Sequence, residues 1–185
     1  CTEFEERTID PIKNYLESIK KLEKEASNTL NMEKTLQFGK YLIEIGEPST
    51  GLEFLKKAAK SENPKAMYEY GCALSESNCI DKDTKAFKYI KKAADKQHID
   101  ALAKYAEFLR RGRGCQKNPT LALKLFKGAA NKGCLAAIKG YSEMLHDGEG
   151  TATNLKEAFK YIKKAAEIGG PEEHFFPGDP RIRLH

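Results

Sequence analysis

The side chains that could support catalysis or metal binding are few and widely separated. Four histidines have neither metal-site spacing nor a cysteine or carboxylate partner at a useful helical interval: His98, His146, His174 and His185. His146 precedes Asp147 directly, but adjacent residues on a helix point in different directions. Nucleophile-elbow, phosphate-loop and dinucleotide-binding motifs are absent. We therefore expect no enzymatic activity, cofactor, metal or small-molecule substrate.

The cysteines allow two interpretations. There are five of them, at irregular spacing and without a Cys-x-x-Cys pair: Cys1, Cys72, Cys79, Cys115 and Cys134. An odd number argues against a complete disulfide framework, so we favour reduced thiols in a cytoplasmic protein. The alternative is a secreted repeat protein with a Cys72–Cys79 disulfide. Because the sequence starts with Cys1 and not Met, a removed signal peptide is compatible with it.

Composition describes a chain that can fold in water. The 185 residues include 32 Lys and Arg against 27 Asp and Glu, a formal net charge of +5. The hydrophobic share of 40% is sufficient for a packed core and argues against a disordered chain. No apolar run reaches the ~18 residues that span a bilayer. Length alone predicts one globular domain.

A repeated helical segment organises the chain. An Ala-Ala pair recurs at a nearly constant interval, at 58–59, 93–94, 129–130 and 165–166. In the second copy Phe87, Ile90 and Ala94 stand at i, i+3 and i+7, the spacing of an apolar stripe on a helix. Self-similarity at this period predicts a repeat architecture and not one central core.

A second helix recurs between these copies, marked by an aromatic residue followed by a small one. The pairs are Phe38-Gly39, Tyr70-Gly71, Tyr105-Ala106 and Tyr141-Ser142. Small residues let two helix axes approach closely. The repeating unit is therefore helix, Gly-containing loop, helix and short turn, and we predict four units at about 32–60, 65–96, 99–132 and 135–168.

These units define the expected domains. Residues 1–30 contain a predicted helix from Pro11 to Ala26, a degenerate repeat or a cap, and residues 31–170 form the solenoid. Residues 171–185 are expected to be irregular, because Pro177 stands where the next helix would continue. The expected helix starts are Asn63-Pro64, Asp100, Asn118-Pro119, Asn154 with Glu157, Thr50 and Asp83, and the expected stops include Gly112 and Gly148.

The period and its motifs resemble the Sel-1-like repeat family. The resemblance rests on Ala101 to Leu109, on Gly112-x-Gly114 and Gly148-x-Gly150, on Asp83 ahead of Lys85-Ala86, and on Lys163 to Ala166. The earlier units depart from the pattern, with Ser77 and Cys79 in place of the loop glycines and with Glu62 and Gln97 in place of turn glycines.

This resemblance implies an all-α, right-handed α/α superhelix that acts as a scaffold for partner proteins. Two related repeats have similar periods. Tetratricopeptide repeats would carry Trp, which this chain lacks, and pentatricopeptide repeats read RNA. The Gly-x-Gly loops and Ala-Ala pairs favour the Sel-1-like assignment. A stack of helix pairs leaves an extended curved surface for binding.

The first helix of each pair is expected to line the concave face. The positions left over from its core stripe are candidate partner-binding residues: Lys40, Tyr68, Glu69, Cys72, Lys104, Glu107, Arg111, Lys139 and Glu143. Such a mixed-charge surface suits a protein or peptide with charged side chains. The alternative is an ordinary solvated helix face.

The second helix carries a basic stripe: Lys56, Lys57, Lys88, Lys91, Lys92, Lys124, Lys127, Lys160, Lys163 and Lys164. A solvated face is the favoured interpretation, and binding of nucleic acid or an anionic surface is the alternative. Arg110, Arg111 and Arg113 could contact a carboxylate or phosphate, but a solvated loop is favoured there too. The predicted function is a non-catalytic scaffold or adaptor that binds proteins.

Overall fold

The computed structural model describes residues 21, 24, 32–76 and 80–169. Within them the secondary structure is helical, with no strand, and forms the predicted right-handed α/α superhelix. Its helices are α2 (Met32–Glu44), α3 (Pro48–Ala59), α4 (Pro64–Glu76), α5 (Ile80–Asp95), α6 (Ile99–Arg111), α7 (Pro119–Asn131), α8 (Leu135–Asp147) and α9 (Leu155–Gly169). Apart from residues 21 and 24, the predicted N-terminal helix lies outside the described residues, as does the tail 171–185.

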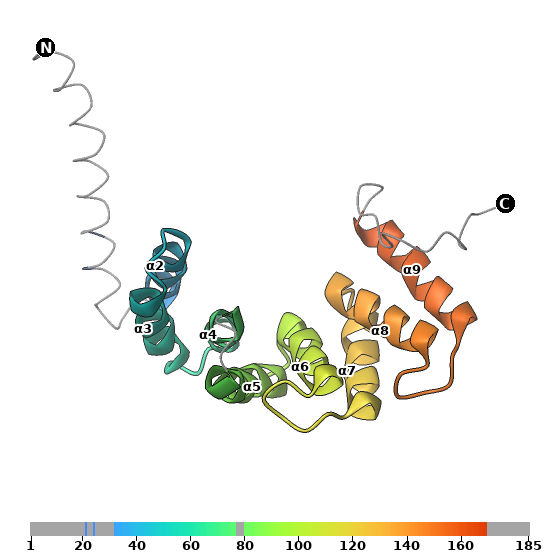
Figure 1. Cartoon of the computed structure of the whole chain (residues 1–185). Coiled ribbons are helices and arrows are strands. Elements are labelled where there is room, and N and C mark those ends of the chain that lie inside the picture. Colours follow the sequence, from blue (N-terminus) through green and yellow to red (C-terminus); the bar gives the residue numbers. More distant parts are fainter. Residues whose placement is uncertain (1–20, 22–23, 25–31, 77–79, 170–185) are drawn as a thin grey trace, which may run out of the picture.

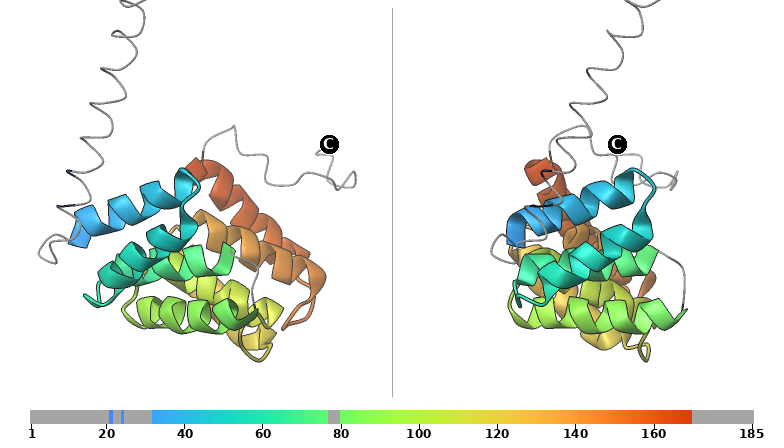
Figure 2. Two further views of the ribbon diagram at one scale, coloured as in Figure 1. Left: turned by 60° about the vertical axis from the view of Figure 1, so that its left-hand side comes forward. Right: turned by 90° about the vertical axis from the view of Figure 1, so that its left-hand side faces the viewer.

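The helices stack into a curved solenoid. Figure 1 shows α2, α4, α6 and α8 along the inner side of the curve and α3, α5 and α7 along its outer side. The further views in Figure 2 show the same stack from other sides, with α2 (blue) and α9 (red) at its two ends. First helices therefore line the concave face, as the sequence predicts.

Small residues set the close crossing inside each pair. A Cβ atom added to Gly51 of α3 would lie 2.7 Å from the carbonyl oxygen of Gly39 in α2. In the next pair, a Cβ on Gly71 would lie 2.6 Å from the Ile90 side chain. The residue after the repeated aromatic position is therefore small because the second helix occupies the space of a larger side chain.

Apolar side chains form a continuous core along the stack. One cluster of buried residues runs from Leu36 in α2 to Phe108 in α6, and a second runs from Ala103 in α6 to Ala165 in α9. Both clusters contact Tyr105, which joins them. The Ala-Ala pairs at 93–94 and 129–130 are at most 2% exposed, so the strongest sequence signal marks the helix interfaces.

Helix starts agree only in part with the sequence predictions. Asn63, Asn118 and Asn154 cap their helices by accepting backbone N–H groups through Oδ1. Three other predicted starts are wrong. Helix α3 begins two residues before Thr50 and α5 three residues before Asp83. Asp100 lies inside α6, where the Nδ1 atom of His98 accepts the N–H of Ala101 at 3.3 Å.

The turns between pairs share one conformation despite different residues. Gly133 has φ +87°, and the non-glycine residues Glu62 and Gln97 have φ +57° and +62°. The replacements in the early units therefore leave the turn in the left-handed region, which non-glycine residues rarely adopt. Gly112 and Gly148 end their helices in that region, as predicted.

Candidate interaction surface

Six of the nine predicted partner-binding residues line one pocket on the concave face. They come from α4, α6 and α8: Tyr68, Lys104, Glu107, Arg111, Lys139 and Glu143. The pocket has a volume of about 410 Å³. Sequence positions about one repeat apart thus lie around a single depression, because successive first helices stand side by side (Figure 1).

The other three predicted residues line a smaller pocket towards the N-terminal end. Lys40 extends from α2, and Glu69 and Cys72 extend from α4. This pocket has a volume of about 260 Å³ and also contains Glu44 and Glu76. The concave face therefore presents two depressions along the solenoid.

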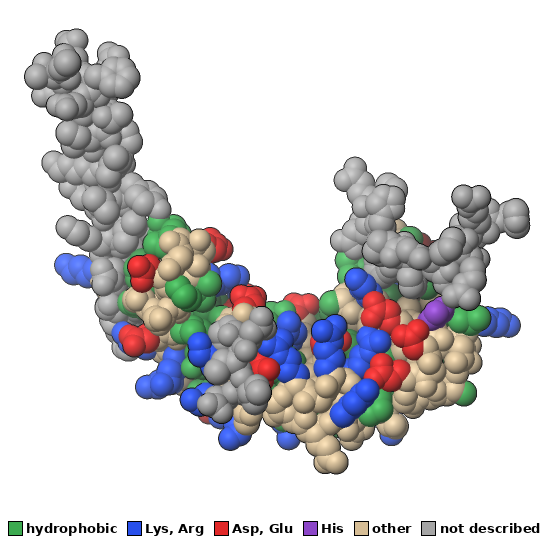
Figure 3. Space-filling model, in the orientation of Figure 1, with side chains coloured by type: hydrophobic (Ala, Val, Ile, Leu, Met, Phe, Trp, Pro, Cys, Tyr) green, Lys and Arg blue, Asp and Glu red, His purple; other side chains and the backbone are tan. Residues whose placement is uncertain are grey.

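Ion pairs neutralise most of the acidic groups in the larger pocket. Glu107 pairs with Arg111 on the same helix, and a carboxylate oxygen of Glu143 lies 2.8 Å from Arg110. Lys104 and Lys139 have no ion-pair partner among the described residues. Asp100, the third carboxylate of the lining, has no ion-pair partner among these residues either, so the two lysines leave a net positive charge available to an acidic ligand. Figure 3 shows the mixture of cationic and acidic side chains over the central helices.

In the smaller pocket the unpaired charges are acidic. Lys40 Nζ lies 3.1 Å from Glu69 Oε1, so its lysine is already paired. Glu44 and Glu76 are exposed and lack an ion-pair partner in the described part of the chain. The free charge on the concave face therefore changes sign, from acidic near α2 to basic near α8.

Tyr68 stands at the edge of the larger pocket as a neutral hydrogen-bonding group. Its ring stacks on His98, with centroids 5.1 Å apart. Burial holds the pKa of the Tyr68 phenol well above its usual range, so the hydroxyl keeps its proton. This hydroxyl already forms a side-chain hydrogen bond with Cys72, one turn further along α4.

The described cysteines are neutral thiols. Cys72, Cys115 and Cys134 are free, and burial raises the pKa of each thiol. A raised pKa disfavours the nucleophilic thiolate. Cys79, the proposed disulfide partner of Cys72, lies outside the described residues.

The floor of the larger pocket was not predicted from the sequence. Phe126 of α7 lies there, although second-helix residues were not considered candidates. Phe126 is only 2% exposed, because Gly140 of α8 packs closely against it: an added Cβ on Gly140 would lie 2.6 Å from the Phe126 ring. Gly140 directly precedes Tyr141, where the other units have Glu69 and Lys104. That glycine was the available sequence signal for a close contact between α7 and α8.

The interpretation of the arginine cluster as a solvated loop is wrong for two of its members. The side chain of Arg110 is 15% exposed and donates to Glu149 at 2.7 Å and to Glu143 at 2.8 Å. Arg113 donates to Asp83 at 2.8 Å and to the carbonyl of Ser75. These partners come from other repeats, so the two arginines connect neighbouring units. Only Arg111 remains largely exposed.

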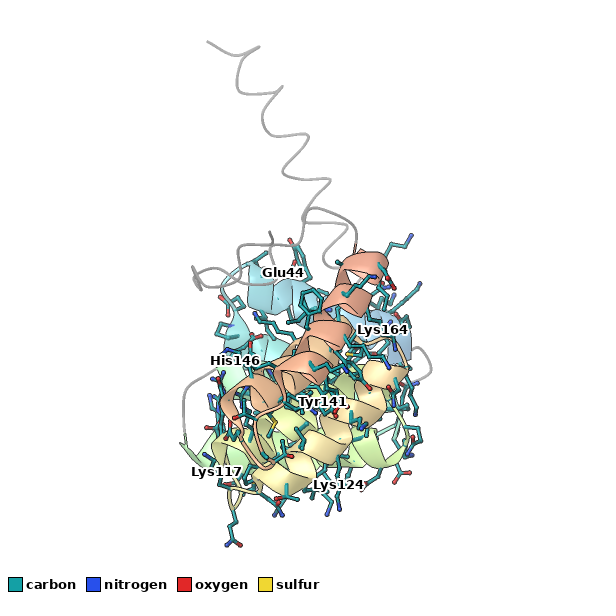
Figure 4. All side chains as sticks on the ribbon, turned by 90° about the vertical axis from the view of Figure 1, so that its right-hand side faces the viewer. Glu44, Lys117, Lys124, Tyr141, His146 and Lys164 are labelled. Carbon is teal, nitrogen blue, oxygen red and sulfur yellow. The ribbon has the colours of Figure 1, made fainter. Side chains whose placement is uncertain are left out.

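The lysines of the second helices lie on the surface, as both the solvated-face interpretation and the alternative of an anionic ligand require. All ten are exposed except Lys164, which is half-buried and donates to the carbonyl of Ala130. Lys127 forms an ion pair with Glu157 of α9 at 3.3 Å, and Lys57 lies over the Phe54 ring. In Figure 4, Lys124 lies on the outer side of the solenoid.

Two further properties concern the described residues. None of their helices is both long and apolar enough to cross a bilayer. In that same part of the chain, no three His, Cys, Asp or Glu side chains gather where they could hold a metal ion.

Comparison with known proteins gives one family. The model described as "Sel1 repeat" matches residues 36–63, 64–98, 99–134 and 135–170. These four matches follow the helix pairs of the structure. A comparison with curated proteins finds no significant match.

Several solved structures have the same fold. A Sel1 repeat protein from Oxalobacter formigenes is 25% identical, with a TM-score of 0.65 over 75% of this chain and 59% of its own. The antigen c5321 of uropathogenic Escherichia coli, described as displaying an SLR fold, is 21% identical, with a TM-score of 0.72 over 82% and 33%. Helicobacter pylori cysteine rich protein B is 23% identical, with a TM-score of 0.52 over 65% and 92%. This chain thus spans about three fifths of the first and one third of the second.

Proposed function

The chain belongs to the Sel1 repeat family, and from this premise we propose that it is a non-catalytic scaffold that binds a segment of a partner protein along its concave face. Sel1 repeats are helical scaffolds typical of protein–protein interaction. The supporting observation is that all nine residues selected from sequence positions alone line two pockets on that face. A solvated helix face would not require such convergence.

The charges suggest the chemistry of the partner. Lys104 and Lys139 are unpaired in the larger pocket, which the ring of Tyr68 also lines. A peptide that places Asp or Glu there would gain charge-assisted hydrogen bonds. Glu44 and Glu76 in the smaller pocket favour a basic residue at the other end. The partner segment would then bind in one direction, because its charges must match this order.

A selection experiment tests this function without knowledge of the partner. A random dodecapeptide library is selected on the full chain, and peptide affinities are measured for the Lys104→Glu/Lys139→Glu variant. We expect enriched acidic peptides whose dissociation constant rises at least about tenfold in the variant, equivalent to about 1.4 kcal/mol.

The matched control places the same charge change on the outer face. Lys88→Glu/Lys91→Glu alters two exposed lysines of α5 and should leave peptide affinity unchanged. If both variants lost the same peptide affinity, net charge alone would explain the effect. If both variants and the parent chain bound the peptides equally, the concave face would be excluded as the binding site.

The same variants test the alternative of nucleic-acid binding. Exposure of nine of the ten stripe lysines leaves that surface open to phosphates. Binding of a random-sequence RNA oligonucleotide with a steep salt dependence, lost in Lys88→Glu/Lys91→Glu, would support this alternative instead.

The secreted, disulfide-bonded form is tested by thiol chemistry. One of the similar structures is described as cysteine rich, whereas Cys72, Cys115 and Cys134 are free here. In denaturant without reductant, all five cysteines should react with a thiol reagent. Reaction of only three would indicate a disulfide and support the alternative.

A further inference from the structure

The outward stripe of each second helix is normally covered by the next repeat. Phe87 of α5 lies against α6, with its ring centroid 5.4 Å from that of Tyr105 and 6.4 Å from that of Phe108. Ala94 of α5 and Ala130 of α7 occupy the same stripe and are 2% and 0% exposed. This surface is therefore a helix-docking surface wherever a following helix exists.

The equivalent stripe of α9 is open among the described residues. We call it the end face and define it as Leu155, Phe159, Ile162 and Ala166, which share one side of the helix at i, i+4, i+7 and i+11. Phe159, the counterpart of Phe87, is 49% exposed, and Leu155 is 60% exposed. Ala166 is exposed as well. Figure 4 looks onto this end of the solenoid, with α9 in front.

The end face is not simply the surface of a poorly packed helix. Ala158 and Ala165, on the adjacent side of α9, are 3% and 0% exposed. Tyr161 donates to Asn131 Oδ1 of α7 at 2.8 Å, and its ring packs at 4.7 Å from that of Tyr141 in α8. One side of α9 thus packs against α7 and α8, while the end face stays exposed.

Charge along the end face selects the partner. A pocket of about 720 Å³ beside Phe159 is bordered by Lys156, Lys160 and Lys163, and none of these lysines has an ion-pair partner among the described residues. The single acidic group in the lining, Glu157, is already paired with Lys127 and accepts a hydrogen bond from Tyr141. The free charge of this pocket lining is therefore positive, although Glu167, one turn beyond Lys163, is also exposed.

We propose that the end face docks an amphipathic helix of a partner protein, with an apolar stripe like that of α6 and an acidic flank. Apolar residues of that helix would cover Phe159 and Ala166 as α6 covers Phe87 and Ala94. Its Asp or Glu side chains would pair with Lys156, Lys160 and Lys163. A second copy of this chain is disfavoured, because two end faces would bring their lysines together. The inference does not depend on the concave face.

Two synthetic peptides provide the test. Both carry the α6 sequence, Ile99–Arg111, with blocked ends; one keeps Lys104, Arg110 and Arg111, and the other replaces all three by glutamate. Fluorescence anisotropy with the full chain should give a dissociation constant at least tenfold lower for the acidic peptide. Equal affinity of the two peptides, or no binding by either, would overturn the proposal.

Variants of exposed residues locate the binding. Phe159→Ser should weaken the acidic peptide at least tenfold, whereas Leu121→Ser, at a residue 37% exposed on α7, should leave affinity unchanged. Lys160→Glu/Lys163→Glu should reverse the preference towards the basic peptide. Unchanged binding by Phe159→Ser would place the peptide elsewhere and contradict the assignment.

Three further outcomes separate the alternatives. Concentration-dependent dimerisation in sedimentation, lost in Phe159→Ser, would assign the end face to a second copy and overturn the proposal. Binding that appears only after residues 170–185 are removed would assign it to the chain's own C-terminal residues, with the same consequence. The Lys104→Glu/Lys139→Glu variant should bind the acidic peptide normally, which separates this result from a failure of the concave face.

Discussion

The first helix pair and the last two differ in how their helices are joined. Helices α2 and α3 are connected by three residues, 45–47, whereas α6 to α7 and α8 to α9 are connected by seven, 112–118 and 148–154. Both kinds of loop begin with a glycine of positive φ at or near the end of the first helix. The long loops do more than reverse the chain, because they contact the preceding repeat.

Those contacts explain the second glycine of each Gly-x-Gly motif. A Cβ on Gly150 would lie 2.7 Å from the backbone of Pro119, where α7 begins, and one on Gly114 would overlap the backbone of Asp83 in α5. Around Gly46 of the short loop there is open space within 4 Å. Some glycines of this pattern are therefore needed only because the backbone has a positive φ. Others are needed also because a side chain would collide with the preceding repeat.

The largest expected effect separates these two roles. Gly150→Ala should destabilise the chain by about 3 kcal/mol, since it combines a left-handed conformation with overlap against backbone atoms. Gly46→Ala should cost only about 1 kcal/mol, from conformation alone. Urea unfolding followed by circular dichroism measures both. Similar losses for the two variants would contradict the distinction.

A smaller effect is expected from the side chains of the long loops. Arg113→Ala leaves Asp83, whose side chain is 14% exposed, without its cation, and should cost about 2 kcal/mol. The matched change is Lys40→Ala, which breaks the exposed ion pair with Glu69 and should cost about 0.3 kcal/mol. The same urea titrations apply. A loss for Lys40→Ala as large as that for Arg113→Ala would mean that the long loops add no special stability.

In the turns between helix pairs, one substitution should raise the stability of the chain and not lower it. Gln97 adopts φ +62° without being glycine, so Gln97→Gly should stabilise the chain by about 1 kcal/mol. The reverse change, Gly133→Gln, should destabilise it by a similar amount, since Gly133 has φ +87° in the equivalent turn. Thermal unfolding of both variants tests the symmetry. A destabilised Gln97→Gly chain would show that the bond from Lys132 to the Gln97 side chain outweighs backbone strain.

The smallest effect concerns pH. Glu149 accepts a hydrogen bond from Arg110, and this bond lowers the pKa of the Glu149 carboxyl. A lowered folded-state pKa contributes stability that is complete above the unfolded value of about 4.3 and is lost as pH falls through the folded value. The Glu149→Gln variant should therefore be less stable than the parent by a few tenths of a kcal/mol at pH 7, and the difference should vanish at pH 2–3. A difference that grows on acidification would contradict the sign.

Much of the helix arrangement was predictable, because it depends on local patterns. Ala-Ala pairs and aromatic–small pairs recur at helical spacing, and both mark buried surfaces. The concave positions followed from the same register. The starts at Thr50 and Asp83 were wrong, since both helices begin earlier than those polar residues.

What could not be predicted depends on contacts across repeats. Arg113 donates to Asp83, thirty residues earlier, and Arg110 to Glu149, thirty-nine residues later. No local pattern pairs such residues, so the arginines resembled a solvated loop. The place of Phe126 beneath the larger pocket was missed for the same reason, because it depends on Gly140 of the following helix packing on the ring.

The direction of the long-loop contacts bears on how the chain assembles during synthesis. Gly114 contacts the start of α5 and Gly150 the start of α7, so each loop meets a segment that leaves the ribosome before it. Domains and repeats can fold progressively from the N-terminal side as the chain emerges. Each new pair would then add to a surface that already exists, and folding could advance repeat by repeat without waiting for the complete chain.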